Sequence, residues 1–152
     1  MDLAAFIRLL EAYRDTRYLF VADGVEHDVR VDRRNPAAEA WLTRRGAGGA
    51  AFITADNPRS RRLTEAENAT ARVRLAAAVR GHGFDALPHT GATLDGAWPA
   101  EQGLLVPGMP LDDLLELAES FGQNAVVWFA PGRPARLVPT RILLDAFGDG
   151  LD

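Results

Sequence analysis

The sequence predicts a single α+β domain built on a largely antiparallel sheet. The chain has 152 residues, of which 47% are hydrophobic, a size and composition that suit one domain with its own core. Asp23-Gly24 separates two segments of alternating apolar residues, which is the pattern of a β-hairpin. Residues 50–130 then show strand and helix signals in the order strand, helix, strand, strand, helix, strand. These signals together indicate a sheet with helices packed against it.

The N-terminal segment, residues 1–49, is expected to place two helices around the hairpin. Apolar residues recur at helical spacing over residues 3–14, and Asp2 stands in the N-cap position. Asn35 and Pro36 suit an N-cap and a first helical residue, so a second helix should begin there and stop at Gly46.

The Asp23-Gly24 turn also fixes the register of the hairpin. A two-residue loop puts on one face the pairs Tyr18 with Val29, Phe20 with His27, and Ala22 with Val25. His27 therefore lies on an apolar face, where we expect a neutral core histidine and not a catalytic base or a ligand.

The core of the domain is expected in residues 50–138. The predicted strands span residues 50–55, 84–88, 103–107 and 125–130, with helices over 65–81 and 111–121 and a weaker strand at 135–139. This strand and helix order is that of a ferredoxin-like βαββαβ layer. Residues 139–152 are expected to form a short amphipathic helix or a docked tail.

The stretch over residues 51–68 combines fold signals with possible chemistry. Asp56-Asn57-Pro58 ends a strand sharply, and Thr64 with Glu67 forms a capping box that begins a helix. The loop between them carries three arginines and a hydroxyl: Arg59, Ser60, Arg61 and Arg62. A basic loop that runs from a strand into a helix N-terminus is a candidate seat for an anion, because backbone N–H groups and guanidinium groups meet there.

Two further positions carry polar or aromatic groups with two interpretations each. Asn68 lies on the apolar stripe of the helix that follows the loop, where an unpaired buried amide costs about 1–3 kcal/mol. Its expected partner is the loop at residues 56–60, with a ligand contact as the alternative. Trp98, close to Glu101 in a turn-rich segment, either covers the edge of the core or stacks on a planar ligand.

Composition excludes several kinds of chemistry. The chain has no cysteine, so thiol nucleophiles, thiolate metal sites and disulfides are excluded, and all 17 basic residues are arginine, which excludes a Schiff-base or P-loop lysine. His82, Asp85 and His89 do not share one strand or helix face, so we predict no metal site and no cofactor.

Charge is distributed unevenly along the chain. Residues 30–80 contain 11 arginines and 5 acids, and the remaining residues contain 6 arginines and 16 acids, which gives the net charge of −4. A basic middle third on an acidic protein is consistent with an anionic partner, and equally with acids and arginines that meet on the folded surface. The sequence shows no signal peptide at its start and no apolar run of about twenty residues, so we expect a cytoplasmic protein without membrane association.

Three segments resemble an uncharacterised bacterial family, the domain of unknown function number 3293. They are AFITADNPRSRRLTEAEN, GAWPAE, and GLLVPG followed by AESFGQNAVVWF. Members carry F-I-T-A-x-N-P, an Asn in the next helix, a Trp and Glu before a strand, and a late G-Q-N-A. The resemblance covers about residues 50–138 and marks the counterparts Thr54, Asn57, Pro58, Asn68, Trp98, Glu101, Gln123 and Asn124. Asp56 and Gln102 depart from the pattern, where an aromatic residue and a serine are expected, and the family implies no activity.

The preferred hypothesis is a small binding protein for an anionic or nucleotide-like ligand at the loop formed by residues 57–62. Its ligand-binding residues would be Asn57, Arg59, Ser60, Arg61, Arg62, Asn68, Trp98, Gln123 and Asn124. A second hypothesis is a hydrolase or nuclease-like enzyme, with Glu101 as general base and Arg61 or Arg62 stabilising developing charge.

The third hypothesis is a protein-interaction or oligomer-forming domain, whose polar residues serve only as caps and turn formers. A small ligand is preferred over long nucleic acid as the partner, because the protein is acidic and lacks a nucleic-acid-binding motif. The first two hypotheses require Asn57, Asn68, Trp98, Glu101 and Gln123 to converge on one concave pocket, and side chains that point to separate places would favour the third.

Overall fold

The computed structural model describes residues 1–151, and the side chains of residues 1–148. The helices in this part of the chain are α1 (Leu3–Arg14), α2 (Pro36–Arg44), the short 3-10 helix η1 (Pro58–Ser60), α3 (Glu65–Gly81), α4 (Leu111–Ser120) and α5 (Arg141–Leu151). The strands are β1 (Thr16–Ala22), β2 (Val25–Val29), β3 (Ala50–Thr54), β4 (Leu87–Thr93), β5 (Glu101–Pro107), β6 (Ala125–Phe129) and β7 (Arg136–Pro139).

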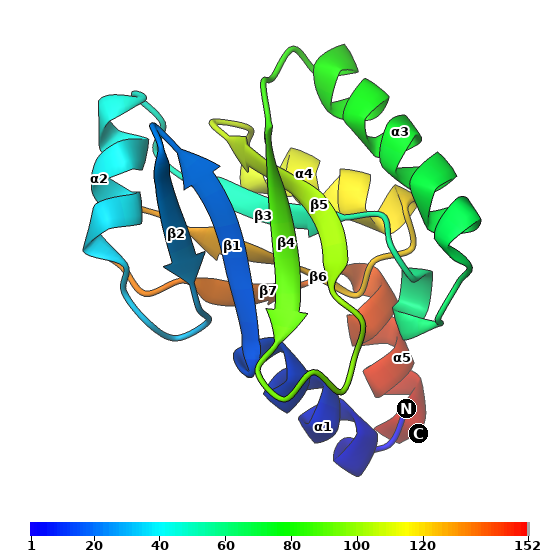
Figure 1. The fold of residues 1–152 in the computed structure, drawn as a ribbon. Coiled ribbons are helices and arrows are strands. Elements are labelled where there is room, and N and C mark those ends of the chain that lie inside the picture. The colour runs from blue at the N-terminus through cyan, green and yellow to red at the C-terminus, as the bar shows by residue number, and fades with distance from the viewer. Residues whose placement is uncertain (152) are drawn as a thin grey trace.

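These seven strands form one antiparallel sheet in the order β2-β1-β4-β5-β3-β6-β7 (Figure 1). The sheet curls until its edges meet, because Val31 after β2 forms a bridge with Ala135 before β7. The Asp32 N–H donates to the Ala135 carbonyl at 2.7 Å, and the Ala135 N–H donates to the Arg33 carbonyl at 3.0 Å. The α+β class and the largely antiparallel sheet are thereby confirmed, whereas the division of the chain into domain segments stays a prediction.

The central strand β3 is buried on both faces of the sheet. Ala50 and Phe52 join a core inside the curl, together with Trp41 of α2. Ala51 and Ile53 join a second core on the other face, beneath α3 and α4. Complete burial of a side chain such as Ile53 contributes about 1.5–3 kcal/mol, so both cores hold this strand in place. The loop that leaves β3 therefore starts from a fixed position.

Turn and cap signals are confirmed. The hairpin has the predicted register, with Tyr18 opposite Val29 and Ala22 opposite Val25. The Asp2 side chain accepts a hydrogen bond from the Ala5 N–H at 2.7 Å, and Asn35 accepts from Ala38 at 3.0 Å. The capping box at Thr64 is also present.

The strand predicted at residues 84–88 begins three residues later in the structure and extends further along the chain. The observed strand, β4, spans Leu87–Thr93, and β5 begins at Glu101, two residues before the predicted start at 103. The turn-rich segment over residues 91–101, which contains Trp98, thus belongs partly to the two strands. The physical reason is the composition of β4. Its inward-facing residues include the polar His89 and Thr93, whereas a strand is recognised in a sequence by apolar residues at these alternating positions.

The C-terminal segment, which was expected as a helix or a docked tail, is the helix α5 beside α1. The Phe6 and Phe147 rings stack there at 4.2 Å between centroids. Within residues 1–151, none of the helices has the length and apolar character needed to cross a bilayer.

Candidate functional site

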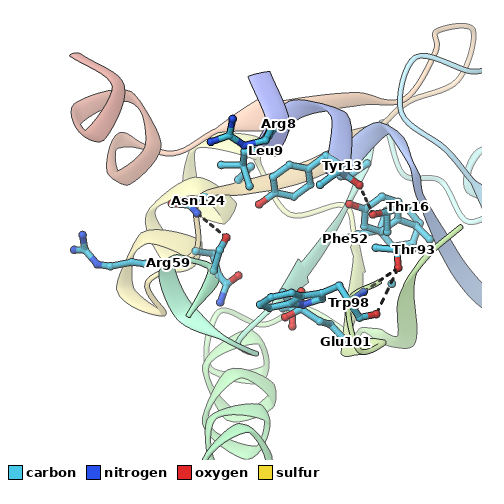
Figure 2. Close-up of a pocket in the computed structure, with 18 of the residues that line it drawn as sticks. Arg8, Leu9, Tyr13, Thr16, Phe52, Arg59, Thr93, Trp98, Glu101 and Asn124 are labelled. Atoms are coloured by element: carbon cyan, nitrogen blue, oxygen red, sulfur yellow. Dashed lines mark hydrogen bonds between the residues drawn. The ribbon is translucent and has the colours of Figure 1, made fainter. Parts of the chain in front are cut away.

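A cavity of about 660 Å³ opens inside the curl of the sheet. Its floor is formed by side chains of the central strands, including Phe52 of β3 and Val127 of β6. Helix α1 covers one side of the cavity with Leu9, Ala12 and Tyr13 (Figure 2). The volume lies within the range of small-molecule sites, about 300–1,000 Å³.

Polar groups gather at the other side of this cavity. They come from η1, from the first residue of β5 and from the segment before β6: Arg59, Ser60, Glu101, Gln123 and Asn124. Trp98 lies above Glu101 in Figure 2 and faces the space below α1. The Trp98 backbone is held by Thr93, whose hydroxyl lies 3.4 Å from both the Trp98 N–H and the Trp98 carbonyl.

The turn at Asn57 shapes this polar side. Asn57 is left-handed, with φ 47°, and so are Arg59 and Ser60, with φ 56° and 59°. Asparagine adopts this conformation more readily than most residues, whereas arginine and serine there carry strain. Three residues of this kind within four positions persist only where the surroundings hold them.

Those surroundings are hydrogen bonds from three later parts of the chain. The Asn57 N–H donates to Asn68 Oδ1 at 3.0 Å, and Asn68 Nδ2 donates back to Asn57 Oδ1 at 3.0 Å. Asn57 Nδ2 donates to Glu101 Oε2 at 2.7 Å, and the Leu63 N–H donates to Asn57 Oδ1 at 2.9 Å. Asn57 thus joins the loop, α3 and β5, and the predicted contact between Asn68 and the loop is present.

Asp56 lies beside this network and is only 1% exposed. Arg72 of α3 binds its carboxylate with two hydrogen bonds, from Nε to Oδ1 at 2.7 Å and from Nη2 to Oδ2 at 2.6 Å. The Gln102 N–H adds a third at 3.1 Å. The residue that departs from the family pattern is therefore one half of a structural ion pair, and it also fixes the start of β5.

The segment Gly122-Gln123-Asn124 closes the loop from its other side. A Cβ on Gly122 would lie 2.7 Å from the Pro58 Cβ, so only glycine fits this approach, and its φ is 71°. Gln123 Nε2 donates to the Asp56 carbonyl at 3.0 Å, and Asn124 Nδ2 donates to Ser60 Oγ at 3.1 Å. The two amides thus position the loop and line the cavity at the same time.

The cavity environment perturbs Glu101. Burial raises the pKa of its carboxyl above the ordinary value of 4.5, and the negative charge of Asp56 acts in the same direction, while the hydrogen bond from Asn57 lowers it. Because the folded pKa is above the unfolded one, the folded protein holds this proton more tightly than the unfolded chain does. The stability carried by the protonated form is therefore lost as pH rises from about 4.5 through the folded pKa.

Replacing Glu101 by Gln is expected to remove this pH dependence, because Gln keeps an oxygen that accepts from Asn57 but has no charge. Urea unfolding between about pH 4 and pH 8 should show the wild type losing stability relative to the variant as pH rises. Glu116→Gln, at an exposed position of α4, serves as the control and should follow the wild type. Parallel curves for wild type and Glu101→Gln would contradict the assignment.

The structure brings six of the candidate residues into the cavity lining: Arg59, Ser60, Trp98, Glu101, Gln123 and Asn124. Asn57 and Asn68 are buried behind Glu101 and are not among the lining residues. Arg61 and Arg62 are exposed and are not among the lining residues. Of the five residues required to converge on one pocket, Trp98, Glu101 and Gln123 therefore line it, whereas Asn57 and Asn68 do not.

Sequence reasoning missed the contribution of α1, whose Arg8, Leu9 and Tyr13 line the cavity. Helical periodicity identified a packing helix but carried no information about which part of the sheet it covers. Burial raises the pKa of Tyr13 far above its ordinary value, so this phenol stays neutral.

His89, which the sequence does not predict to form a metal site with His82 and Asp85, has the surroundings of a buried aromatic residue. It is 5% exposed and packs edge-on against Phe52, with ring centroids 5.1 Å apart, on the cavity floor. Burial lowers the pKa of His89 to about 4, so the imidazole is neutral at neutral pH. Among the described residues, no cluster of three or more His, Asp or Glu could hold a metal ion.

The fold and the cavity define a small α+β protein with a ligand-sized site in the curl of its sheet. Residues 53–126, close to half of the chain, match the model of the family described as "Protein of unknown function (DUF3293)". This match confirms the resemblance seen in the sequence, over residues 53–126 of the chain. Neither the search of curated proteins nor the search of solved structures gave a match.

Proposed function

We propose that this protein binds a small ligand with a planar, nucleobase-like group and an anionic group. The observation that carries the proposal is the cavity of about 660 Å³, which combines aromatic walls with polar groups on one side. Trp98 and Tyr13 lie on opposite sides of it in Figure 2, at positions suited to contact a planar ring. Glu101 supplies a hydrogen-bonding group beside that ring.

The rim supplies the positive charge for the anionic group. Arg8 of α1 and Arg59 of η1 lie on different elements at the edge of the cavity, and both are exposed. Within the described residues, neither arginine forms an ion pair. A guanidinium group and an anionic oxygen form charge-assisted hydrogen bonds, about twice as strong as neutral ones.

A panel of nucleoside monophosphates tests the proposal, with adenosine and ribose 5-phosphate as half-ligands. A member present at about a hundred times its dissociation constant should add roughly 2.7 kcal/mol to stability in a thermal-shift measurement. We expect AMP or a related monophosphate to stabilise the protein, and each half-ligand to bind more weakly. No shift with any member would contradict the proposal and favour an interaction domain without a ligand site.

Two matched pairs of variants test whether the ligand binds in the cavity. Arg59→Ala should weaken monophosphate binding about tenfold or more, whereas Arg61→Ala, in the same loop but outside the cavity, should leave it unchanged. Ala12→Trp should fill the cavity from α1 and abolish binding, whereas Ala4→Trp, on the same helix but outside the lining, should not. Equal losses within either pair would place the ligand elsewhere.

The same incubations test the enzyme hypothesis, which the position of Glu101 in the cavity supports. Chromatography of the bound nucleotide over time would reveal hydrolysis, and turnover lost in Glu101→Gln with binding retained would identify catalysis. Recovery of unchanged ligand would leave binding as the function.

We also infer that residues 50–130 form a ferredoxin-like core. In support of this, α3 connects β3 to β4, β5 follows directly, and α4 connects β5 to β6. These four strands lie side by side in the order β6-β3-β5-β4, all antiparallel. Both helices pack on the same face, in the core that contains Ile53. Fold alone assigns no function.

A further inference from the structure

We infer that the ligand carries a chain of two or more phosphates, which leaves the cavity across Arg61 and Arg62. The inference rests on the proposed function and specifies the ligand class: a nucleobase-like head with a polyanionic tail. Two sources share this chemistry, a nucleoside polyphosphate and the end of a single-stranded oligonucleotide.

The first step is the location of positive charge relative to the cavity. The arginines among the lining residues are Arg8 and Arg59, and both are exposed at the rim. Figure 2 shows Arg59 extending away from the cavity, so its guanidinium group lies outside the cavity. Charged groups are expensive to place in an apolar cavity without a counter-charge. Anionic groups of the ligand are therefore expected outside the rim.

The second step is the direction in which positive charge continues. Arg61 and Arg62 follow Arg59 directly along the chain, and both are exposed. No ion pair to any of these three arginines is formed in the part of the chain that the structure describes. Three charges within four positions, starting at the rim, match successive phosphates better than one.

The third step is the rigidity of the loop that carries these charges. The Arg59 N–H donates to the Gly122 carbonyl at 2.7 Å, and the Arg61 N–H donates to the Pro58 carbonyl at 3.1 Å. The Leu63 N–H donates to Asn57 Oδ1 at 2.9 Å on the far side of Arg62. The backbone is therefore fixed on both sides of the arginines, which lowers the entropy cost of binding a tail.

The capping box rules out a simpler place for the tail at the start of α3. The Glu67 N–H donates to Thr64 Oγ1 at 3.1 Å, and the Thr64 N–H donates to Glu67 Oε1 at 3.1 Å. Glu67 also puts a negative charge in the first turn. An anion is thus better held by the arginine side chains than by this helix terminus.

The test compares AMP, ADP, ATP and the dinucleotide pApA, titrated without metal against three proteins. These are the wild type, Arg61→Ala/Arg62→Ala, and Arg80→Ala/Arg133→Ala, which changes the net charge equally at exposed positions away from the cavity. We expect the wild type to bind a tailed ligand about three to ten times more tightly than AMP, and the loop variant to lose this gain. AMP affinity should be equal in all three proteins.

Salt dependence gives a second readout. For an oligonucleotide end, loss of two phosphate contacts should reduce the slope of log affinity against log salt concentration by about 1.4. The Arg80→Ala/Arg133→Ala protein should keep the wild-type slope.

The outcomes separate the inference from the proposed function. Tighter binding of ATP alone assigns the tail to a nucleoside polyphosphate, and tighter binding of pApA alone assigns it to an oligonucleotide end. AMP binding with no gain from either tail overturns the inference and leaves the proposed function standing. Equal losses in both double variants also overturn it, because a long-range charge effect would then explain the gain. Failure of AMP and all tailed ligands to bind overturns both.

Discussion

Replacing Arg72 by Ala is expected to lower the free energy of unfolding by about 3–5 kcal/mol. The reason is the Asp56 carboxylate, which is 1% exposed and receives both of its side-chain hydrogen bonds from Arg72. Without the guanidinium group, a buried charge keeps only the Gln102 N–H as a partner. An uncompensated charge of this kind is far more costly than the loss of an exposed ion pair.

Chemical unfolding of three variants checks this expectation. Arg80→Ala, at an exposed position of the same helix, should stay within about 0.5 kcal/mol of the wild type. Asp56→Asn/Arg72→Ala should be more stable than Arg72→Ala alone, because the double variant leaves no buried charge. A small effect of Arg72→Ala would show that Asp56 obtains its compensation from another source.

The parts of the fold that depend on local chemistry were predictable from the sequence. Asp23-Gly24 determines a two-residue hairpin and therefore its register, and Thr64 with Glu67 determines where α3 begins. These signals act between neighbours in the chain, so no knowledge of tertiary contacts is needed. The curl of the sheet was not predictable, since it depends on the contact of Val31 with Ala135, more than a hundred residues apart.

The misplaced strand β4 shows why the site itself is hard to predict. Its inward-facing residues include His89, Gly91 and Thr93, which line the cavity and break the apolar alternation expected of a strand. The same property that gives the cavity polar and open walls thus hides the strand from pattern analysis. A departure from the usual strand pattern is expected where residues are placed to form a site.

The candidate residues other than Asn68 were identified because each lies in a turn or loop or at a strand end, whereas Asn68 was identified as a polar residue on the apolar stripe of α3. Their division into two layers was not predictable. Trp98 and Glu101 line the cavity, whereas Asn57 donates to Glu101 from behind and is itself bound by Asn68, and only the hydrogen-bond geometry shows this arrangement.

Replacing Asn57 by Ala is expected to lower the free energy of unfolding by about 4 kcal/mol or more and to weaken monophosphate binding. The side chain forms three hydrogen bonds, to Glu101, Leu63 and Asn68, and its removal leaves buried or half-buried polar groups without partners at about 1–3 kcal/mol each. The left-handed backbone at this position adds about 1–2 kcal/mol for Ala.

The comparison of Asn57→Ala with Asn57→Gly separates these two contributions. Glycine adopts the left-handed conformation without a Cβ clash, so Asn57→Gly should be about 1 kcal/mol more stable than Asn57→Ala while it lacks the same hydrogen bonds. Reversed stability of the two variants in urea unfolding would show that residue 57 is not held in this conformation in solution.

Both Asn57 variants should also change the titration of Glu101. The hydrogen bond from Asn57 lowers the pKa of this carboxyl, so its loss should move that pKa further upward, toward the value that burial alone would set. Stability lost as pH rises should then extend over a wider window than in the wild type. If this window does not change while stability falls, Asn57 supports the fold alone, and Glu101 is set in the cavity by other contacts.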